Sequence, residues 1–284
     1  MKEDTPSRTA QRVAMRRAAH QILDEPRVFE DPLAMSVIGR DAADWLRSTP
    51  ETPGDRASRH LRAFMAARSR FAEDELSAAI ARGAAQYVVL GAGLDTYAYR
   101  NRAPASDLRV FEVDHPATQA WKQTRLAEAG IAIPSSLRFV PVDFEKETLA
   151  SALEDAGFDR TRITFFSWLG VTPYLTAEAT MTTLVFIASL PAGSGVVFDY
   201  AVERSSLSPL EQMALDALAS RVARAGEPFQ LFLEPQALGA MLRAAGFHHL
   251  EDLGPLEIDA RYFGHRTDGL RVGSGLAHLM SARV

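Results

Sequence analysis

The sequence contains no cysteine among its 284 residues. Without thiols the chain can form neither a disulfide nor a thiolate metal site, which excludes disulfide-stapled secreted domains and cysteine-ligated zinc modules. The polar opening, residues 1–6, lacks the apolar core of a secretory signal. We therefore expect a cytoplasmic protein whose fold depends on an ordinary hydrophobic core.

Long apolar runs and an excess of basic charge are also missing. The most apolar stretch, residues 184–200, is broken by Pro191, Gly193 and Gly195, so it predicts a helix end, a turn and a buried strand rather than a membrane span. Lysine and arginine number 31 against 36 acidic residues, whereas nucleic-acid binders concentrate basic charge. We expect neither a membrane nor a nucleic acid as a partner.

Two kinds of catalytic motif are absent as well. The seven histidines are scattered, and no His-Glu-x-x-His helix is present, so no metal site is expected. No Gly-x-Ser-x-Gly elbow of a serine hydrolase occurs either.

Hydrophobic residues make up 47% of the chain, and their spacing alternates between strand and helix periods along most of it. The predicted strands cover residues 87–90, 108–113, 137–141, 163–168, 195–200, 248–253 and 276–282. The clearest helices between them are predicted over residues 116–129 and 177–189 and from Pro235 to a Gly246 cap. This alternation predicts an α/β fold, a mostly parallel sheet with helices on both faces.

Two regions stand outside the alternation. Residues 5–48 are predicted to be helical, and the Pro- and Gly-rich stretch 47–56 to be a loop. We therefore divide the chain into an N-terminal helical cover, residues 1–57, and a ligand-binding α/β domain, residues 58–284. The segment 205–225, inserted after the fifth strand, is predicted to be a helical lid.

An arginine interrupts the apolar face of the helix predicted over residues 59–82. Apolar residues recur there at spacings of three and four, and Arg68 falls within the stripe. Arginine is rarely buried on such a face without a partner. Its guanidinium binds carboxylates through paired hydrogen bonds, so Arg68 is either a clamp for the carboxylate of an amino-acid-like cofactor or one half of a structural ion pair.

A glycine turn, Gly91-Ala92-Gly93, follows the first predicted strand. Glycine permits positive φ and close approach of a ligand, and the N–H groups of a following helix would suit a phosphate or a carboxylate. A plain tight turn and dinucleotide binding are the alternatives. The dinucleotide pattern prefers Gly or Ala at its sixth position, and that position is Thr96, which weighs against NAD.

Carboxylates follow the next two strands. Asp114 lies 21 residues beyond Gly93, the separation expected for a group that accepts both ribose hydroxyls. Glu112, on the same strand face, is the second candidate for that role, or a solvated strand residue. After the third strand, Asp143 is a candidate to accept a hydrogen bond from an adenine amino group, with Phe144 against the ring, or to cap a helix.

Together these pieces resemble the leucine carboxyl methyltransferase-like branch of the class I S-adenosyl-L-methionine (SAM)-dependent methyltransferases. The resemblance spans residues from about 9 to 282 and rests on Asp31-Pro32, Arg68 and the runs 89–96, 112–116, 142–144 and 168–175. It implies a Rossmann-like seven-stranded mixed sheet flanked by helices, an N-terminal helical cover, SAM as the cofactor and methyl transfer as the reaction. Asp31 is expected to cap a helix that begins at Pro32.

The resemblance also implies roles for individual residues. Arg68, with His20 as a second contact, would bind the methionyl carboxylate, the glycine turn would pack on the methionyl part, Asp114 would hold the ribose, and Asp143 with Phe144 would flank the adenine. The full set of expected cofactor-binding residues is His20, Arg68, Gly91, Ala92, Gly93, Asp95, Asp114, His115, Asp143, Phe144, Trp168 and Leu169.

One position departs from the family pattern. Members often carry a glutamate after the fourth strand, near the sulfonium, where this chain has Leu169. A carboxylate beside the reacting sulfur is then absent or comes from elsewhere. Trp168 and Tyr174 are candidates to line the pocket there, or to lie in the core. The catalytic residue stays unassigned; Asp199, Tyr200 and Glu203, after the fifth strand, are candidates for a general base.

We expect O-methylation of a small-molecule carboxylate or hydroxyl. Three alternatives remain open: a protein carboxyl methyltransferase, a SAM-binding protein without catalysis, and an NAD-dependent oxidoreductase. The last would need a Tyr-x-x-x-Lys pair, but Tyr174 is followed at the fourth position by Glu178.

Overall fold

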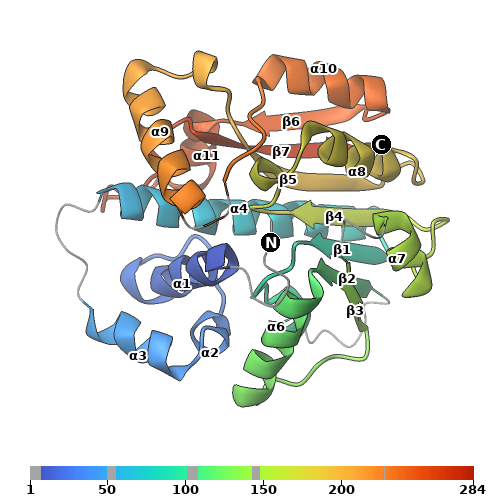
Figure 1. The fold of residues 1–284 in the computed structure, drawn as a ribbon, viewed down its shortest axis with the longest axis horizontal. Helices are drawn as coiled ribbons and strands as arrows, with labels where there is room; N and C mark the ends of the chain where they lie inside the picture. Colours follow the sequence, from blue (N-terminus) through green and yellow to red (C-terminus); the bar gives the residue numbers. More distant parts are fainter. Residues whose placement is uncertain (1–7, 50–55, 101–107, 143–147, 225, 227) are drawn as a thin grey trace.

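The computed structural model describes residues 8–49, 56–100, 108–142, 148–224, 226 and 228–284 (Figure 1). A seven-stranded sheet in the order β3-β2-β1-β4-β5-β7-β6 forms its centre. The strands are β1 Gln86–Leu90, β2 Arg109–Asp114, β3 Leu137–Pro141, β4 Thr164–Trp168, β5 Gly195–Ala201, β6 His249–Leu253 and β7 Ala277–Arg283. β7 runs antiparallel to both of its neighbours, and the other paired strands are parallel. The mixed α/β sheet expected from the sequence is confirmed.

Helices surround this sheet on both faces and beyond one of its edges. They are α1 Arg8–Leu23, α2 Ala34–Val37, α3 Arg40–Ser48, α4 Arg56–Ala81, α5 Tyr97–Arg100, α6 Pro116–Glu128, α7 Leu149–Asp155, α8 Ala177–Ala188, α9 Pro209–Arg224, α10 Pro235–Ala245 and α11 Pro255–Tyr262, with 3-10 turns η1 Thr172–Tyr174 and η2 Arg204–Ser206. Figure 1 shows α1 and α9 on the side of the sheet toward which β1 and β4 point. Among the helices of the described residues, none combines the length and apolarity needed to cross a membrane.

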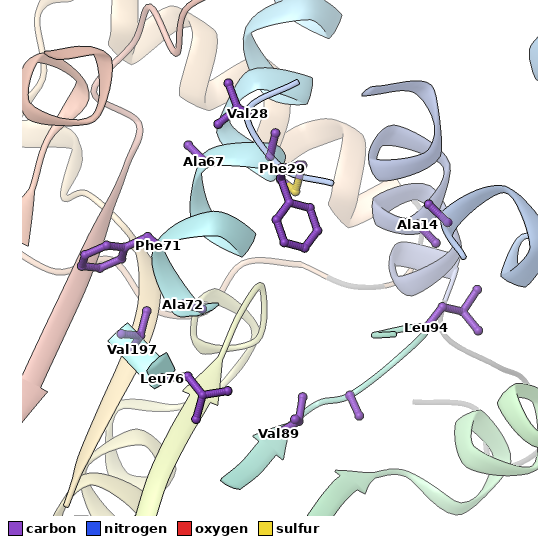
Figure 2. Close-up of a cluster of buried hydrophobic side chains, with 14 of the residues drawn as sticks. Ala14, Val28, Phe29, Ala67, Phe71, Ala72, Leu76, Val89, Leu94 and Val197 are labelled. Carbon is purple, nitrogen blue, oxygen red and sulfur yellow. The ribbon is translucent and has the colours of Figure 1, made fainter. Parts of the chain in front are cut away.

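The sheet separates two hydrophobic cores because successive strand residues point to opposite faces. On one face, α4 packs through Phe71 and Leu76 near Val89 of β1 and Val197 of β5 (Figure 2). On the other face, Phe198 of β5 belongs to a second core that includes side chains of α7, α8 and α10. The first core continues into the N-terminal helices, so the cover and α4 share one hydrophobic core.

Helix boundaries follow the local sequence signals in most places. α10 begins after Glu234, whose carboxylate accepts a hydrogen bond from Ala237 N at 2.6 Å, and ends at Gly246 with φ of 112°. The start of this helix at Pro235 and its Gly246 cap were expected. The predicted helix over residues 59–82 is α4, although it begins at Arg56, so the boundary placed at residue 57 falls in its first turn. The expected helix within 205–225 is α9; its action as a lid stays a prediction.

The predicted helix start at Asp31-Pro32 is wrong. α2 begins two residues later, with Leu33 at its N-cap and no side-chain cap. Asp31 Oδ1 instead accepts a hydrogen bond from Leu33 N at 3.1 Å, which makes a turn, while its other oxygen bonds to the buried Thr96 hydroxyl at 2.8 Å. Buried partners therefore draw the Asp31 side chain into the interior, and it does not cap the helix.

Candidate cofactor site

The candidate site lies where four neighbouring strands end. In the sheet order β2-β1-β4-β5, the residues at or just after the ends of the first three strands are Asp114, the glycine turn and Leu169-Gly170, and Asp199 of β5 lies one residue beyond Phe198, the partner of the last residue of β4. Ligands of open parallel sheets bind at this carboxyl edge, near the point where the strand order reverses. The order reverses between β1 and β4, so the glycine turn and Gly170 occupy the centre of the edge.

Gly91 and Gly93 are required by backbone conformation and by close packing. Their φ angles are 67° and 45°, in the left-handed region that favours glycine. A Cβ on Gly91 would lie less than 3.0 Å from Val171 Cγ2, and one on Gly93 would lie 3.2 Å from Ala10 Cβ of α1. The turn is therefore pressed between the loop after β4 and the N-terminal cover.

Four backbone N–H groups of the glycine turn donate to oxygens of the protein itself. Gly91 N and Ala92 N both lie close to Val113 O, at 2.8 and 3.0 Å, and Asp95 N donates to Ala92 O at 2.7 Å. Gly93 N donates to Asp114 Oδ2 at 2.6 Å. These four N–H groups are therefore bonded within the protein, and the end of β2 occupies three of them.

The helix after the turn provides no stronger anion site. α5 is a single turn, Tyr97–Arg100, and Tyr97 N is already bonded to Asp95 Oδ1 at 2.8 Å. Asp95, expected among the cofactor contacts, thus closes the turn that leads into α5. A pyrophosphate needs a row of free N–H groups at a helix start, so the geometry weighs against a dinucleotide.

Asp114 holds the end of β2 against the glycine turn. Its Oδ2 accepts the hydrogen bond from Gly93 N, and its Oδ1 accepts one from His115 N at 2.7 Å. Burial raises the pKa of Asp114, and the two backbone donors oppose that rise. His115 is the N-cap of α6, with Nδ1 accepting from Ala117 N at 3.3 Å. Each Asp114 oxygen retains a lone pair for a further donor, such as a hydroxyl.

Glu112, the second candidate for the ribose, is committed elsewhere. It is 1% exposed, and its Oε2 lies 2.6 Å from Lys122 Nζ and accepts a hydrogen bond from Tyr99 OH at 3.1 Å. Burial raises the pKa of Glu112 to about 7, against the opposing effect of Lys122. Of the two carboxylates on β2, only the half-buried Asp114 stands at the strand end.

Arg68 is buried at the middle of α4 and forms an ion pair. Its Nη1 donates to Asp199 Oδ2 at 2.7 Å, and Asp199 Oδ1 accepts a hydrogen bond from Gly170 N at 2.5 Å. Gly170 has φ of +72°, and a Cβ there would lie 3.0 Å from both Nη atoms of Arg68. The alternative of a structural ion pair is thus observed, next to a glycine that leaves room for the guanidinium.

The two residues after Ser167 point to opposite cores. Trp168 is 3% exposed and packs against Phe198, with ring centroids 6.4 Å apart and ring planes tilted by 59°, in the core under α8 and α10. Its expected contact with the cofactor stays a prediction. Leu169 is half-buried against the α4-side core. The ring of Tyr174 lies 5.3 Å from that of Phe229.

His20 is buried in the N-terminal cover, where both of its ring nitrogens have protein partners, and its expected contact with the methionyl carboxylate stays a prediction. Its Nδ1 lies 2.8 Å from Asp24 Oδ2, and its Nε2 accepts hydrogen bonds from Val28 N and Phe29 N at 3.1 and 3.2 Å. Arg62 also binds Asp24, at 2.8 and 2.9 Å. Both ring nitrogens are therefore satisfied inside the cover. Asp143 and Phe144 lie outside the described residues.

Sequence reasoning missed a polar network, here called the clasp, formed by Arg17, Asp31, Thr96 and Arg100. Asp31 Oδ2 lies 2.8 Å from Arg17 Nε and accepts the Thr96 hydroxyl. Arg100 Nε donates to Thr96 Oγ1 at 2.9 Å. The clasp ties α1 and the Asp31 turn to the residues that follow the glycine turn. Two of its members had been singled out in the sequence for other reasons, Asp31 as a helix cap and Thr96 as evidence against NAD.

Comparison of folds finds the same architecture in other solved structures. The structure of a methyltransferase from Thermobifida fusca, so named provisionally, covers 99% of this chain and 96% of its own at a TM-score of 0.55 and 16% identity. A DUF574 family protein from Streptomyces avermitilis covers 94% and 96% at a TM-score of 0.52 and 18% identity. At these identities the likeness concerns the fold alone, which is the Rossmann-like fold of the SAM-dependent methyltransferases.

Sequence comparison makes the assignment specific. Residues 10–188 match the leucine carboxyl methyltransferase family. YktD of Bacillus subtilis, named provisionally as a SAM-dependent methyltransferase, is 34% identical over 95% of this chain and 95% of its own. A relative from Mycobacterium sp. (strain JLS) with the same provisional description is 37% identical over 65% of this chain and 62% of its own. The chain belongs to the leucine carboxyl methyltransferase family, and SAM, not a nicotinamide dinucleotide, is its cofactor.

Proposed function

We propose that this chain transfers the methyl group of SAM to an oxygen atom of a small molecule, and that the acceptor oxygen belongs to a carboxylate. The observation that carries this choice is that Asp199 and Tyr200, the two buried candidates for a general base, are both committed to other partners. A hydroxyl acceptor needs a base to remove its proton, whereas a carboxylate is already ionised at neutral pH.

The state of each candidate base supports the proposal. Asp199 accepts hydrogen bonds from Arg68 and Gly170 N. Tyr200 OH donates to Asp252 Oδ2 at 2.8 Å, and burial, reinforced by the Asp252 charge, raises the pKa of Tyr200 well above its usual range. A phenol so hard to ionise is a poor base. Glu203 is exposed at the start of η2.

The order of groups along the sheet edge fits SAM. Asp114 at the end of β2 would accept the ribose hydroxyls, the glycine turn after β1 would lie under the methionyl part, and Arg68 beside β5 would hold its carboxylate. Neighbouring strands are about 4.8 Å apart, so the ends of β2 and β5 are about 14 Å apart. A ligand with a ribose at one end and an amino-acid group at the other suits this span.

When bound, SAM supplies an electrophilic methyl group on a positively charged sulfur. The protein then has to hold the acceptor oxygen in line with that methyl group and to exclude water from the site. α1 contributes to the second task, since Ala10 packs on Gly93. We assign the same task to α9, residues 209–224, as the lid; Glu211 of α9 accepts a hydrogen bond from Gly275 N at 2.7 Å, which anchors it to the loop before β7.

The test uses SAM with an isotopically labelled methyl group and separate panels of small carboxylic acids, phenols and peptides with a C-terminal leucine. Methyl esters release labelled methanol on mild base treatment, whereas methyl ethers do not. We expect base-labile label on a small carboxylic acid. Base-stable label would indicate that the acceptor is a hydroxyl and not a carboxylate. Label confined to the peptides would indicate a protein carboxyl methyltransferase.

Catalysis itself is a separate part of the proposal, because Leu169 stands where family members often have a glutamate. Formation of S-adenosylhomocysteine that depends on an added acceptor would support catalysis. Tight SAM binding without turnover on any panel would leave a SAM-binding protein that does not catalyse transfer.

A further inference from the structure

We propose that Asp199 binds the ammonium group of SAM, beside Arg68, whose binding of the methionyl carboxylate belongs to the proposed function; the two side chains then form a two-charge subsite for the amino-acid end of SAM. The inference rests on the proposed function, and it assigns Asp199 a binding role that differs from general-base catalysis. The amino-acid end of SAM is a zwitterion, with one negative and one positive group on the same carbon. The subsite presents the complementary pair.

The geometry of the pair leaves bonding capacity on both partners. Among the described residues, Arg68 makes one hydrogen bond, through Nη1 to Asp199 Oδ2, although a guanidinium has five N–H donors. Each oxygen of Asp199 accepts one hydrogen bond, from Arg68 and from Gly170 N, and each has a second lone pair. Because both members have unused hydrogen-bond donors or lone pairs, this ion pair can bind a zwitterion and remain intact.

Gly170 fixes the position of this pair relative to the rest of the site. Both Nη atoms of Arg68 lie 3.0 Å from the place where a Cβ would stand, so the guanidinium rests against bare backbone. The next residue, Val171, packs on Gly91 in the same close manner. Two consecutive loop residues therefore connect the charge pair to the glycine turn, where the methionyl part of SAM is expected to lie.

The charge balance explains why a carboxylate is needed at this position. Both side chains are buried, with 5% and 7% exposure for Arg68 and Asp199. With Arg68 alone, a bound SAM would place its ammonium in a buried site without a counter-charge, which is costly. The loop after β4 has Leu169 in place of a carboxylate. Asp199 reaches the same loop from the neighbouring strand through its bond to Gly170 N.

The experiment compares three ligands by calorimetry on the full chain. S-adenosylhomocysteine has both charged groups, decarboxylated SAM has the ammonium but lacks the carboxylate, and 5′-methylthioadenosine lacks both. The variants are Asp199→Asn and Arg68→Gln, with Asp252→Asn as the matched control. Asp252 is also a partly buried carboxylate at this end of the sheet, but it bonds to Tyr200 and His278.

We expect a separation of the two charges. Asp199→Asn weakens both ammonium-bearing ligands about 10- to 100-fold, the range for a charge-assisted hydrogen bond, and leaves methylthioadenosine unchanged. Arg68→Gln weakens the binding of S-adenosylhomocysteine by a factor in the same range but leaves the affinity for decarboxylated SAM unchanged. Asp252→Asn changes none of the three affinities.

Two results would overturn the inference. Equal losses for all three ligands in Asp199→Asn would show that the pair only supports the fold, and unchanged binding of decarboxylated SAM would show that Asp199 does not meet the ammonium. Methylthioadenosine binding also reports whether each variant is folded. Failure of the proposed function is distinguishable, because the unaltered chain would then bind these ligands with the expected pattern but would form no methyl ester with the panel of small carboxylic acids.

Discussion

Replacing Gly91 with alanine tests the packing at the centre of the candidate site. The position has φ of +67°, which costs a residue with a Cβ about 1–2 kcal/mol. The new Cβ would also stand less than 3.0 Å from Val171 Cγ2. Valine is stiff about χ1, so the methyl cannot swing away freely, and overpacking of this kind costs about 1–3 kcal/mol. Gly91→Ala should therefore reduce the free energy of unfolding by about 2–5 kcal/mol.

The two contributions can be separated by a second substitution. Val171→Ala removes the clashing methyl, and the nearest remaining atom of that side chain, Cβ, would be 3.6 Å from the new Cβ, an ordinary contact. By itself Val171→Ala should cost about 1–2 kcal/mol through lost burial of two methyl groups. The double variant should therefore be more stable than the sum of the single losses predicts, by about 1–3 kcal/mol.

Urea unfolding of the four proteins measures this coupling, and Gly130→Ala is the control. Gly130 has φ of +66°, and no atom outside its neighbours lies within 4 Å of the place where a Cβ would stand, so it reports the backbone cost alone, about 1–2 kcal/mol. Additive losses for Gly91→Ala and Val171→Ala would refute the argument that Val171 is what makes Gly91 necessary. A loss at Gly91 no larger than that at Gly130 would refute it as well.

Three further variants test the buried charges. Although burial raises the pKa of Asp24, hydrogen bonds from His20 and Arg62 outweigh that effect and lower the pKa to about 2. The resulting stability is present above about pH 4 and is lost as the pH falls toward 2, so the free energy of unfolding of Asp24→Asn should lack about 2 kcal/mol of this pH dependence. An unchanged pH dependence of unfolding in the variant would contradict this. Lys122→Met should cost about 3–5 kcal/mol in urea unfolding because it leaves Glu112 buried without a cation, and Lys122→Met with Glu112→Gln should recover most of it; a double variant no better than the single one would argue against the pair. Asp114→Ala should weaken SAM and S-adenosylhomocysteine alike by about 1.5–3 kcal/mol in calorimetry, since both carry the same ribose, and a loss confined to one ligand would remove Asp114 from the ribose.

The sheet was predictable because its strands are short apolar runs separated by turn residues. Each end of each predicted strand lies within one residue of the observed end, and Pro235 and Gly246 marked the ends of α10 correctly. Such signals are local, since a cap or a strand pattern depends on residues close in sequence. The start of α2 was missed because Asp31 is drawn inward by Thr96, a residue 65 positions away.

The same distinction applies to the candidate site. Spacing along the chain located the glycine turn and Asp114, since both follow directly from strand ends. It could not show that Asp199 would be the partner of Arg68, because the two are 131 residues apart and meet only through the packing of α4 on β5. The partners of His20 were not predictable either: Asp24, Val28 and Phe29 are close in sequence, but only the folded turn brings their polar groups to the ring.

The clasp connects the N-terminal cover to the segment that follows the glycine turn, which predicts a thermodynamic link between docking of the cover and binding of the cofactor. Thr96 belongs to the segment that follows the glycine turn, and its hydroxyl is held by Asp31 of the cover. If ligand binding at the turn favours the docked cover by some factor, docking must favour ligand binding by that same factor. Slower amide exchange along α1 on adding S-adenosylhomocysteine would be the signature of this reciprocity. Exchange of cofactor between turnovers would then proceed through brief undocking of the cover.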